Sequence, residues 1–119
     1  MAENIAVMIT KPPYGTEEAF AGMRQALALQ VSGLMERTVV LMMGEGTLNA
    51  LSTQHPQALS MPSNVESVED LITLEAEVYV ISEDLEALCS DARLIEGIQS
   101  MDWDDARDML SAMDVVTTF

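Results

Sequence analysis

Residues 5–10 read Ile-Ala-Val-Met-Ile-Thr, and this stretch decides the fold class of the chain. A short apolar run rich in β-branched residues is typical of a strand that is buried on both faces of a parallel sheet. Residues 11–15, Lys-Pro-Pro-Tyr-Gly, end this strand, because proline lacks a backbone donor and glycine permits a tight turn. Thr16, followed by Glu17 and Glu18, then predicts the start of a helix. The loop between them is expected at the carboxyl end of the strand, where open α/β sheets form ligand crevices.

The same alternation continues along the chain. Further strands are predicted at residues 37–43, 77–81, 94–100 and 114–119, and helices at 16–32, 48–52 and 67–76 and from residues 82 and 102 onward. The predicted caps are Gly33 at a helix end and Thr47, Ser67, Ser82 and Asp102 at helix starts. Apolar residues in the first helix recur at spacings of three and four, namely Phe20, Met23, Leu27, Val31 and Leu34, and are expected to pack on the sheet. Strands alternating with helices predict an α/β fold with a parallel sheet and right-handed crossovers.

The length and composition indicate one domain, spanning residues 1–119. No apolar run approaches the ~18 residues of a membrane-spanning helix. The first residues include acidic Glu3 and no basic segment, so we expect no signal peptide and a cytoplasmic protein. Cys89 is the only cysteine, which excludes an intrachain disulfide and suits a reducing compartment.

The charge balance is strongly acidic, with 20 acidic and 5 basic residues and a net charge of −15. Without a basic stripe to neutralise phosphates, neither bare nucleic acid nor an anionic membrane is an expected partner. Two interpretations of the acidity stay open: a solvated surface that favours solubility, or docking onto a basic partner. The 10 methionines are more than one small core usually needs, and they suit the adaptable contacts of an oligomer.

Polar and glycine residues at the ends of the first three predicted strands form a candidate ligand crevice. The second strand ends in Gly44-Glu45-Gly46, a pattern that allows a sharp turn but lacks the third glycine of a dinucleotide site. The candidate ligand-binding residues are Lys11, Tyr14, Gly15, Thr16, Gly44, Glu45, Gly46 and Ser82. Lys11 is the only lysine and is placed to meet an anion, although ordinary solvated turns account for the same residues. His55 stands alone, and with no metal-ligand spacing we expect neither a metal nor a cofactor.

Three stretches together resemble the DsrE/DsrF-like family, and most of all its DsrF/TusC branch. They are residues 13–18, Pro-Tyr-Gly-Thr-Glu-Glu, the Gly44-Glu45-Gly46 strand end, and residues 114–119, Asp-Val-Val-Thr-Thr-Phe. The resemblance implies a three-layer α/β/α fold around a five-stranded parallel sheet in strand order 4-3-2-1-5. It also implies assembly into homo-oligomers (trimers or hexamers), or into hetero-oligomers with cysteine-bearing homologues, and a role in intracellular sulfur relay.

Active members of that family carry a persulfide on a cysteine just after the third strand. In this chain Ile81 stands at that position, or Val80 in a shifted register, and neither can carry sulfur. The resemblance therefore implies a non-catalytic scaffold or partner subunit of a sulfurtransferase assembly. Two alternatives stay open: a protein or enzyme that binds a small anionic ligand in the crevice, and a sulfur carrier that uses Cys89. Cys89 is the only candidate catalytic thiol, and its spacing from Leu85 and Leu88 predicts that it packs in the core.

Overall fold

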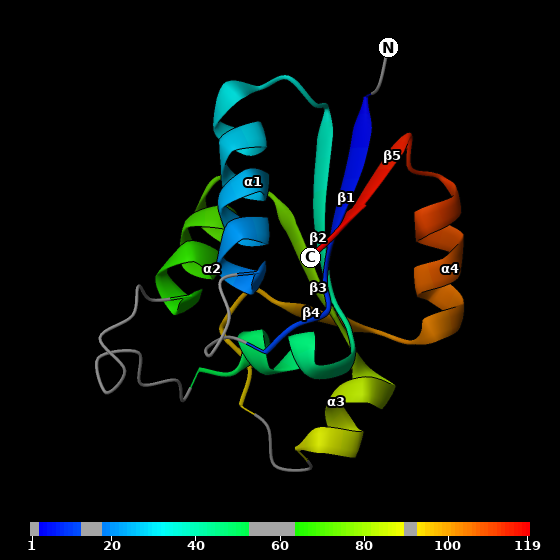
Figure 1. Ribbon diagram of the computed structural model, residues 1–119. Coiled ribbons are helices and arrows are strands. Elements are labelled where there is room, and N and C mark those ends of the chain that lie inside the picture. The colour runs from blue at the N-terminus through cyan, green and yellow to red at the C-terminus, as the bar shows by residue number, and fades with distance from the viewer. Residues whose placement is uncertain (1–2, 13–17, 53–63, 90–92) are drawn as a thin grey trace.

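The computed structural model describes residues 3–12, 18–52, 64–89 and 93–119, which contain a five-stranded parallel sheet (Figure 1). Its strands are β1 (Asn4–Ile9), β2 (Arg37–Met42), β3 (Glu77–Ile81), β4 (Gln99–Met101) and β5 (Val115–Thr118). They lie in the order β4-β3-β2-β1-β5, and every neighbouring pair is parallel. Both the predicted α/β class and the strand order are thereby confirmed.

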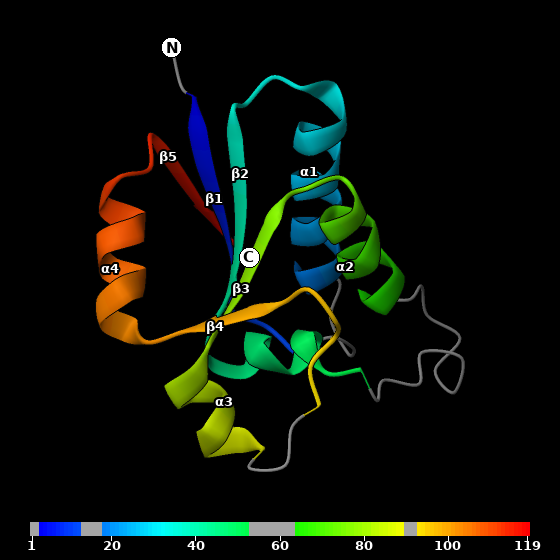
Figure 2. The ribbon, with the colours of Figure 1, turned by 180° about the vertical axis from the view of Figure 1, so that it is seen from behind.

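Helices cover both faces of the sheet and the end at which its strands finish. They are α1 (Glu18–Ser32), the 3₁₀ helix η1 (Gly44–Ala50), α2 (Asn64–Thr73), α3 (Ser82–Leu88) and α4 (Trp103–Ser111). Both views show α1 and α2 on one face and α4 on the other, with η1 and α3 beyond the carboxyl ends of the strands (Figures 1 and 2). Among the described residues, no helix has the length and apolar character needed to cross a bilayer.

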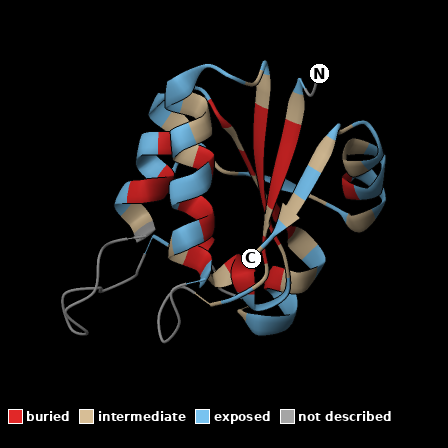
Figure 3. Ribbon diagram, turned by 45° about the horizontal axis from the view of Figure 1, so that its top comes forward, coloured by how far each residue is buried: buried red, intermediate tan, exposed pale blue. Residues whose placement is uncertain are grey.

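The inner strands are mostly apolar because they contact a hydrophobic core on each side. Successive side chains of a strand point to opposite faces. On β2, Val40 and Met42 therefore join the larger core beneath α1 and α2, whereas Leu41 joins a smaller cluster beneath α4. Ile81 and Ala106 complete the buried part of that smaller cluster. Figure 3 shows the buried residues gathered on the inner strands and on the helix surfaces that face them.

The fourth strand is shorter than the predicted 94–100 and begins later. Gly97 has a φ of +100°, and a Cβ added there would lie 2.7 Å from a side-chain carbon of Ile72 on α2. The chain therefore turns at this glycine, and only Gln99–Met101 pairs with β3. Leu94, placed in the strand by its apolar character, instead forms an isolated antiparallel bridge with Leu51.

Several predicted helix starts are wrong, although the predicted helices exist. The segment after β2 becomes helical at Gly44, so Thr47 lies inside η1 and its hydroxyl donates to the Gly44 carbonyl at 2.8 Å. Helix α2 starts three residues before the predicted Ser67. The prediction for α4 is confirmed, since Asp102 accepts a hydrogen bond from the N–H of Asp105 at 2.8 Å.

Helix α1 packs on the sheet through a smaller face than its apolar spacing predicts. Its buried residues are Ala19, Gly22, Met23 and Ala26. Gly22 allows the close approach, because a Cβ there would lie only 2.5 Å from a side-chain carbon of Ile9. The far end of the predicted stripe is solvent-exposed, with 68% of Val31 and 75% of Leu34 accessible. The expectation that the whole stripe packs on the sheet is therefore wrong.

Candidate functional site

The loops that follow β1 and β2 are joined at the carboxyl edge of the sheet. Gly46 packs directly on β1, and a Cβ added to it would lie 2.0 Å from the carbonyl oxygen of Ile9. That oxygen also accepts a hydrogen bond from the N–H of Met43 at 3.0 Å. Beyond it, the buried side-chain amide of Asn49 donates to the carbonyl of Lys11 at 3.0 Å. The predicted meeting of these two loops is thus present, and glycine is needed at position 46 for it.

The first turn of α3 ties the glycine loop to α4. The carboxylate of Asp84 accepts from the N–H of Gly44 at 2.8 Å and from the indole N–H of Trp103 at 3.0 Å. Glu83 accepts from the backbone N–H of Trp103 at 2.7 Å, at the start of α4. Ser82, predicted to cap α3, is instead its first residue, and its hydroxyl donates to the carbonyl of Met101 at 3.4 Å.

These contacts bear on the predicted anion crevice. Gly44 donates to Asp84, and the N–H of Gly46 donates to the carbonyl of Met43 at 2.8 Å. Both glycine N–H groups therefore have partners within the chain, and the partner of Gly44 is itself a carboxylate. An anion approaching this loop would have to displace that carboxylate, against like-charge repulsion.

The remaining residues of the predicted crevice divide into two groups. Lys11 and Glu45 are exposed at the ends of β1 and β2. Tyr14, Gly15 and Thr16 lie outside the described residues, as does His55. Ligand binding at the crevice stays a prediction. Within the described ranges, no group of three or more His, Cys, Asp or Glu residues is arranged to hold a metal ion.

The two positions considered for sulfur chemistry lie at opposite ends of α3. Ile81 is the last residue of β3, is wholly buried, and belongs to the smaller cluster beneath α4. Cys89 follows α3, where its N–H donates to the carbonyl of Leu85 at 2.8 Å. Its half-buried side chain packs against the larger core, as predicted, whereas Leu88, expected on the same face, is 49% exposed. A thiol at 89 and a side chain at 81 therefore lie in different cores.

A charged cross-link joins β2 and β3 near the starts of these strands, away from the carboxyl edge. The Arg37 guanidinium donates to both carboxylate oxygens of Glu77, once at 2.8 Å, and the Tyr79 hydroxyl donates to the same carboxylate at 2.6 Å. The hydrogen bond from Arg37 is the main cause that lowers the pKa of Glu77, and the bond to Glu77 raises the pKa of Tyr79. With the charges paired, this cluster is a structural clamp between strands.

Sequence reasoning did not single out Asp84, Trp103 or Asn49, which connect the loops at the carboxyl edge. Their hydrogen bonds join residues far apart in the chain, so no local spacing marks them. A polar Asn49 between apolar neighbours was the one available signal of a buried hydrogen bond.

Comparison with known proteins supports the resemblance seen in the sequence. The model of the DsrE/DsrF-like family matches residues 3–119. The chain belongs to the DsrE/DsrF-like family. Proteins of this family are generally related to sulfur relay, and they form assemblies. The match does not distinguish the branches within the family.

Solved structures show the same fold at low sequence identity. YchN from E. coli superposes with a TM-score of 0.88 at 22% identity, with all of both chains covered. A protein of unknown function from Methanobacterium thermoautotrophicum, MTH1491, superposes with a TM-score of 0.72 at 13% identity. The match covers 97% of this chain and 98% of MTH1491. BT1422 from Bacteroides thetaiotaomicron, a conserved protein of unknown function, superposes with a TM-score of 0.69 at 10% identity. The match covers 98% of this chain and 95% of BT1422. At these identities the likeness establishes the DsrE-like fold and no shared activity.

Proposed function

We propose that this chain is a non-catalytic subunit of an intracellular sulfur-relay assembly, of the DsrF/TusC type, and acts through residues 1–119 as one domain. The observation that carries the proposal is Ile81. It is the last residue of β3, at the position where active relatives are expected to hold their cysteine, and its wholly buried side chain packs with Leu41 and Ala106. An isoleucine in that place stabilises the sheet and cannot bind sulfur.

The surroundings of Cys89 also support a non-catalytic role. The residue lies at the carboxyl end of α3, where the helix carbonyls carry partial negative charge and do not favour a thiolate. Its side chain packs against apolar residues of the larger core. Reactive cysteines instead occur in electropositive, accessible surroundings.

The proposal predicts that this chain does not carry persulfide sulfur, and a sulfane-sulfur loading assay tests this. The chain and its Cys89→Ser variant are treated with polysulfide under anaerobic conditions, freed of excess reagent, and assayed for sulfane sulfur by cold cyanolysis. A cysteine-bearing relative is the positive control. We expect the wild-type chain to match Cys89→Ser, and the relative to carry sulfur on its cysteine. Stoichiometric loading that depends on Cys89, followed by transfer to an acceptor thiol, would refute the proposal.

Assembly is the second requirement of a partner subunit. We expect a complex with a cysteine-bearing relative from the same organism, or a trimer or hexamer of this chain, detected by native mass spectrometry and by light scattering. A clean monomer across micromolar concentrations, with no complex after co-expression, contradicts the scaffold role. The assembly result does not depend on the sulfur assay, so the lack of sulfur loading and the formation of a complex are tested independently.

A further inference from the structure

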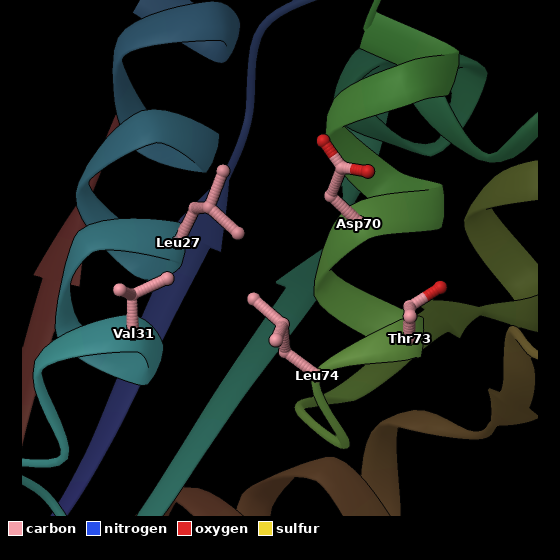
Figure 4. A pocket seen from close by; sticks show the side chains of 5 residues that line it. All are labelled: Leu27, Val31, Asp70, Thr73 and Leu74. Atoms are coloured by element: carbon pink, nitrogen blue, oxygen red, sulfur yellow. The ribbon is translucent and has the colours of Figure 1, made fainter.

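An open apolar groove lies between α1 and α2, away from the carboxyl edge of the sheet. Its volume is about 330 Å³, and it is lined by Leu27 and Val31 of α1, by Leu74 just after α2, and by Asp70 and Thr73 of α2. In Figure 4, Leu27 and Val31 extend from α1 toward the side on which Leu74 lies. The accessible fractions of Val31 and Leu74 are 68% and 42%. Large apolar side chains gathered at one exposed groove are typical of a binding surface.

The groove has a fixed shape, because hydrogen bonds hold the turn that presents Leu74. The side-chain amide of Gln30 on α1 donates to the Leu74 carbonyl at 2.6 Å. The Leu74 N–H donates to the Asp70 carbonyl at 3.0 Å, and Glu75 then reverses the chain with a φ of +69°. Leu27 is half-buried and packs against the larger core from the other wall. A partner would therefore meet a largely preformed surface, which lowers the entropic cost of binding.

The α2 side of the groove is acidic. A second hollow of about 390 Å³ lies across α2 and shares Thr73 with the groove, and its lining includes Glu69 and Glu96. Asp70 lines the groove itself, and Glu69 and Glu96 lie beyond it in the second hollow. On the α1 side, the nearby cation Arg24 lies 5.6 Å from the centre of the Phe20 ring. An occupant of complementary chemistry combines apolar anchors with positive charge.

We propose that this groove binds a basic amphipathic helix of another protein. Apolar side chains spaced by three and four residues would contact Leu27, Val31 and Leu74, with lysine or arginine beside the acidic border. A helix suits a furrow between two helices, which is a recurring mode of peptide recognition. A second copy docked groove to groove is disfavoured because it would bring the acidic α2 sides of two grooves together. The proposal does not depend on the role in sulfur relay.

A designed peptide provides the probe. It is a fluorescent 18-residue helix of leucine and lysine with leucines at i, i+3, i+4 and i+7, and its control has the same composition in scrambled order. Binding to the full chain is measured by anisotropy in about 150 mM salt, where exposed charges are partly screened. We expect the patterned peptide to bind at least about tenfold more tightly than the scrambled one, because only its leucines share one face. Equal binding would mean that charge alone attracts the peptide, and would overturn the proposal.

Variants of the chain then locate the site. The Val31→Ser/Leu74→Ser pair is expected to weaken binding about tenfold or more, the loss typical of buried interface anchors. The matched control is Leu88→Ser/Val116→Ser, whose residues are 49% and 43% exposed on α3 and β5, and which should stay within about twofold of wild type. Circular dichroism verifies that all variants fold. Equal loss in both pairs overturns the proposal.

The acidic border and the second-copy alternative are tested separately. Asp70→Asn should weaken binding and reduce its dependence on salt, whereas unchanged salt dependence counts against the proposed charge contact. Light scattering measures self-association of the wild type and of Val31→Ser/Leu74→Ser. If copies of the chain associate through this groove and the patterned peptide fails to compete, the groove is a self-interface and the proposal is wrong.

Discussion

Gly46 is the residue on which the meeting of β1 and the glycine loop depends, and its replacement by alanine gives the most direct test of that geometry. A Cβ at position 46 would lie 2.0 Å from the oxygen and 2.6 Å from the carbon of the Ile9 carbonyl, and 3.0 Å from the nitrogen of Thr10. Ordinary contacts between heavy atoms lie near ~3.5 Å, so loop and strand must separate by roughly 1.5 Å. The neighbour is backbone, which cannot rotate away as a side chain would.

Two effects contribute to the loss of stability expected in Gly46→Ala. Overpacking a filled interior costs about 1–3 kcal/mol. Separating the loop from β1 also weakens the hydrogen bond from Met43 to Ile9, worth about 1 kcal/mol. Gly46→Ala is therefore expected to reduce the free energy of unfolding by about 2–4 kcal/mol. A chain of this size has about 6–18 kcal/mol in total, so the variant should still fold. Urea unfolding at one fixed protein concentration measures the change, because association would alter apparent stability.

Alanine substitutions at two other glycines serve as controls, because they show the general cost of replacing glycine without this clash. Gly44 and Gly33 have φ values of +54° and +69°, and a Cβ at either meets no atom within 4 Å. Alanine at those positions suffers only the left-handed conformation, about 1–2 kcal/mol. Gly46→Ala should exceed both losses in the same assay. If it falls within about 0.5 kcal/mol of wild type, the glycine loop does not rest on β1 and the arrangement of the carboxyl edge is wrong.

Two further substitutions test the clamp between strands and the start of α4. Glu77→Gln should cost about 1 kcal/mol at neutral pH, since its ion pair with Arg37 is more than one-third exposed. The folded state lowers the pKa of Glu77, so its contribution is present above the ordinary glutamate pKa and is lost as pH falls through the lower value. The gap between wild type and Glu77→Gln in urea melts should therefore close on acidification, and a gap that widens would contradict this. Asp102→Ala should cost about 1 kcal/mol by removing the cap on the Asp105 N–H, and Asp104→Ala, in the same turn, should cost clearly less in the same melts.

The sequence predicted the parallel sheet well where strands are buried on both sides. The runs at β1, β2 and β3 are mostly apolar because each strand faces a core above and below, and the buried residues of these strands show this requirement. β4 lies at the sheet edge and is only three residues long, and the apolar Leu94 and Ile95 before it pack outside the strand. An edge strand needs few apolar residues, so hydrophobicity alone misplaced it.

The candidate site was predicted less completely than the fold. Alternation indicated that the loops after β1 and β2 would meet, and Gly46 at Ile9 confirms it. The hydrogen bonds of Asp84 to Gly44 and to Trp103 were not predictable, because they depend on how α3 and α4 pack around the sheet. Periodicity reports which face of an element is apolar, and carries no information on which distant donor a carboxylate will meet.

Ile81 stands where active relatives are expected to carry a reactive cysteine, and its surroundings determine what a side chain at this position can do. From sequence, its place at the end of the third predicted strand matched the position at which active relatives are expected to carry their cysteine. In the structure its side chain is wholly buried beneath α4, in the cluster that Trp103 flanks. Trp103 is held there by hydrogen bonds from its indole to Asp84 and from its backbone to Glu83. A cysteine at 81 would be packed away from solvent, and burial in apolar surroundings makes a thiol less ready to ionise. A reactive thiol at position 81 would thus require releasing α4 as well as changing one residue, and under the proposed non-catalytic role the isoleucine contributes packing.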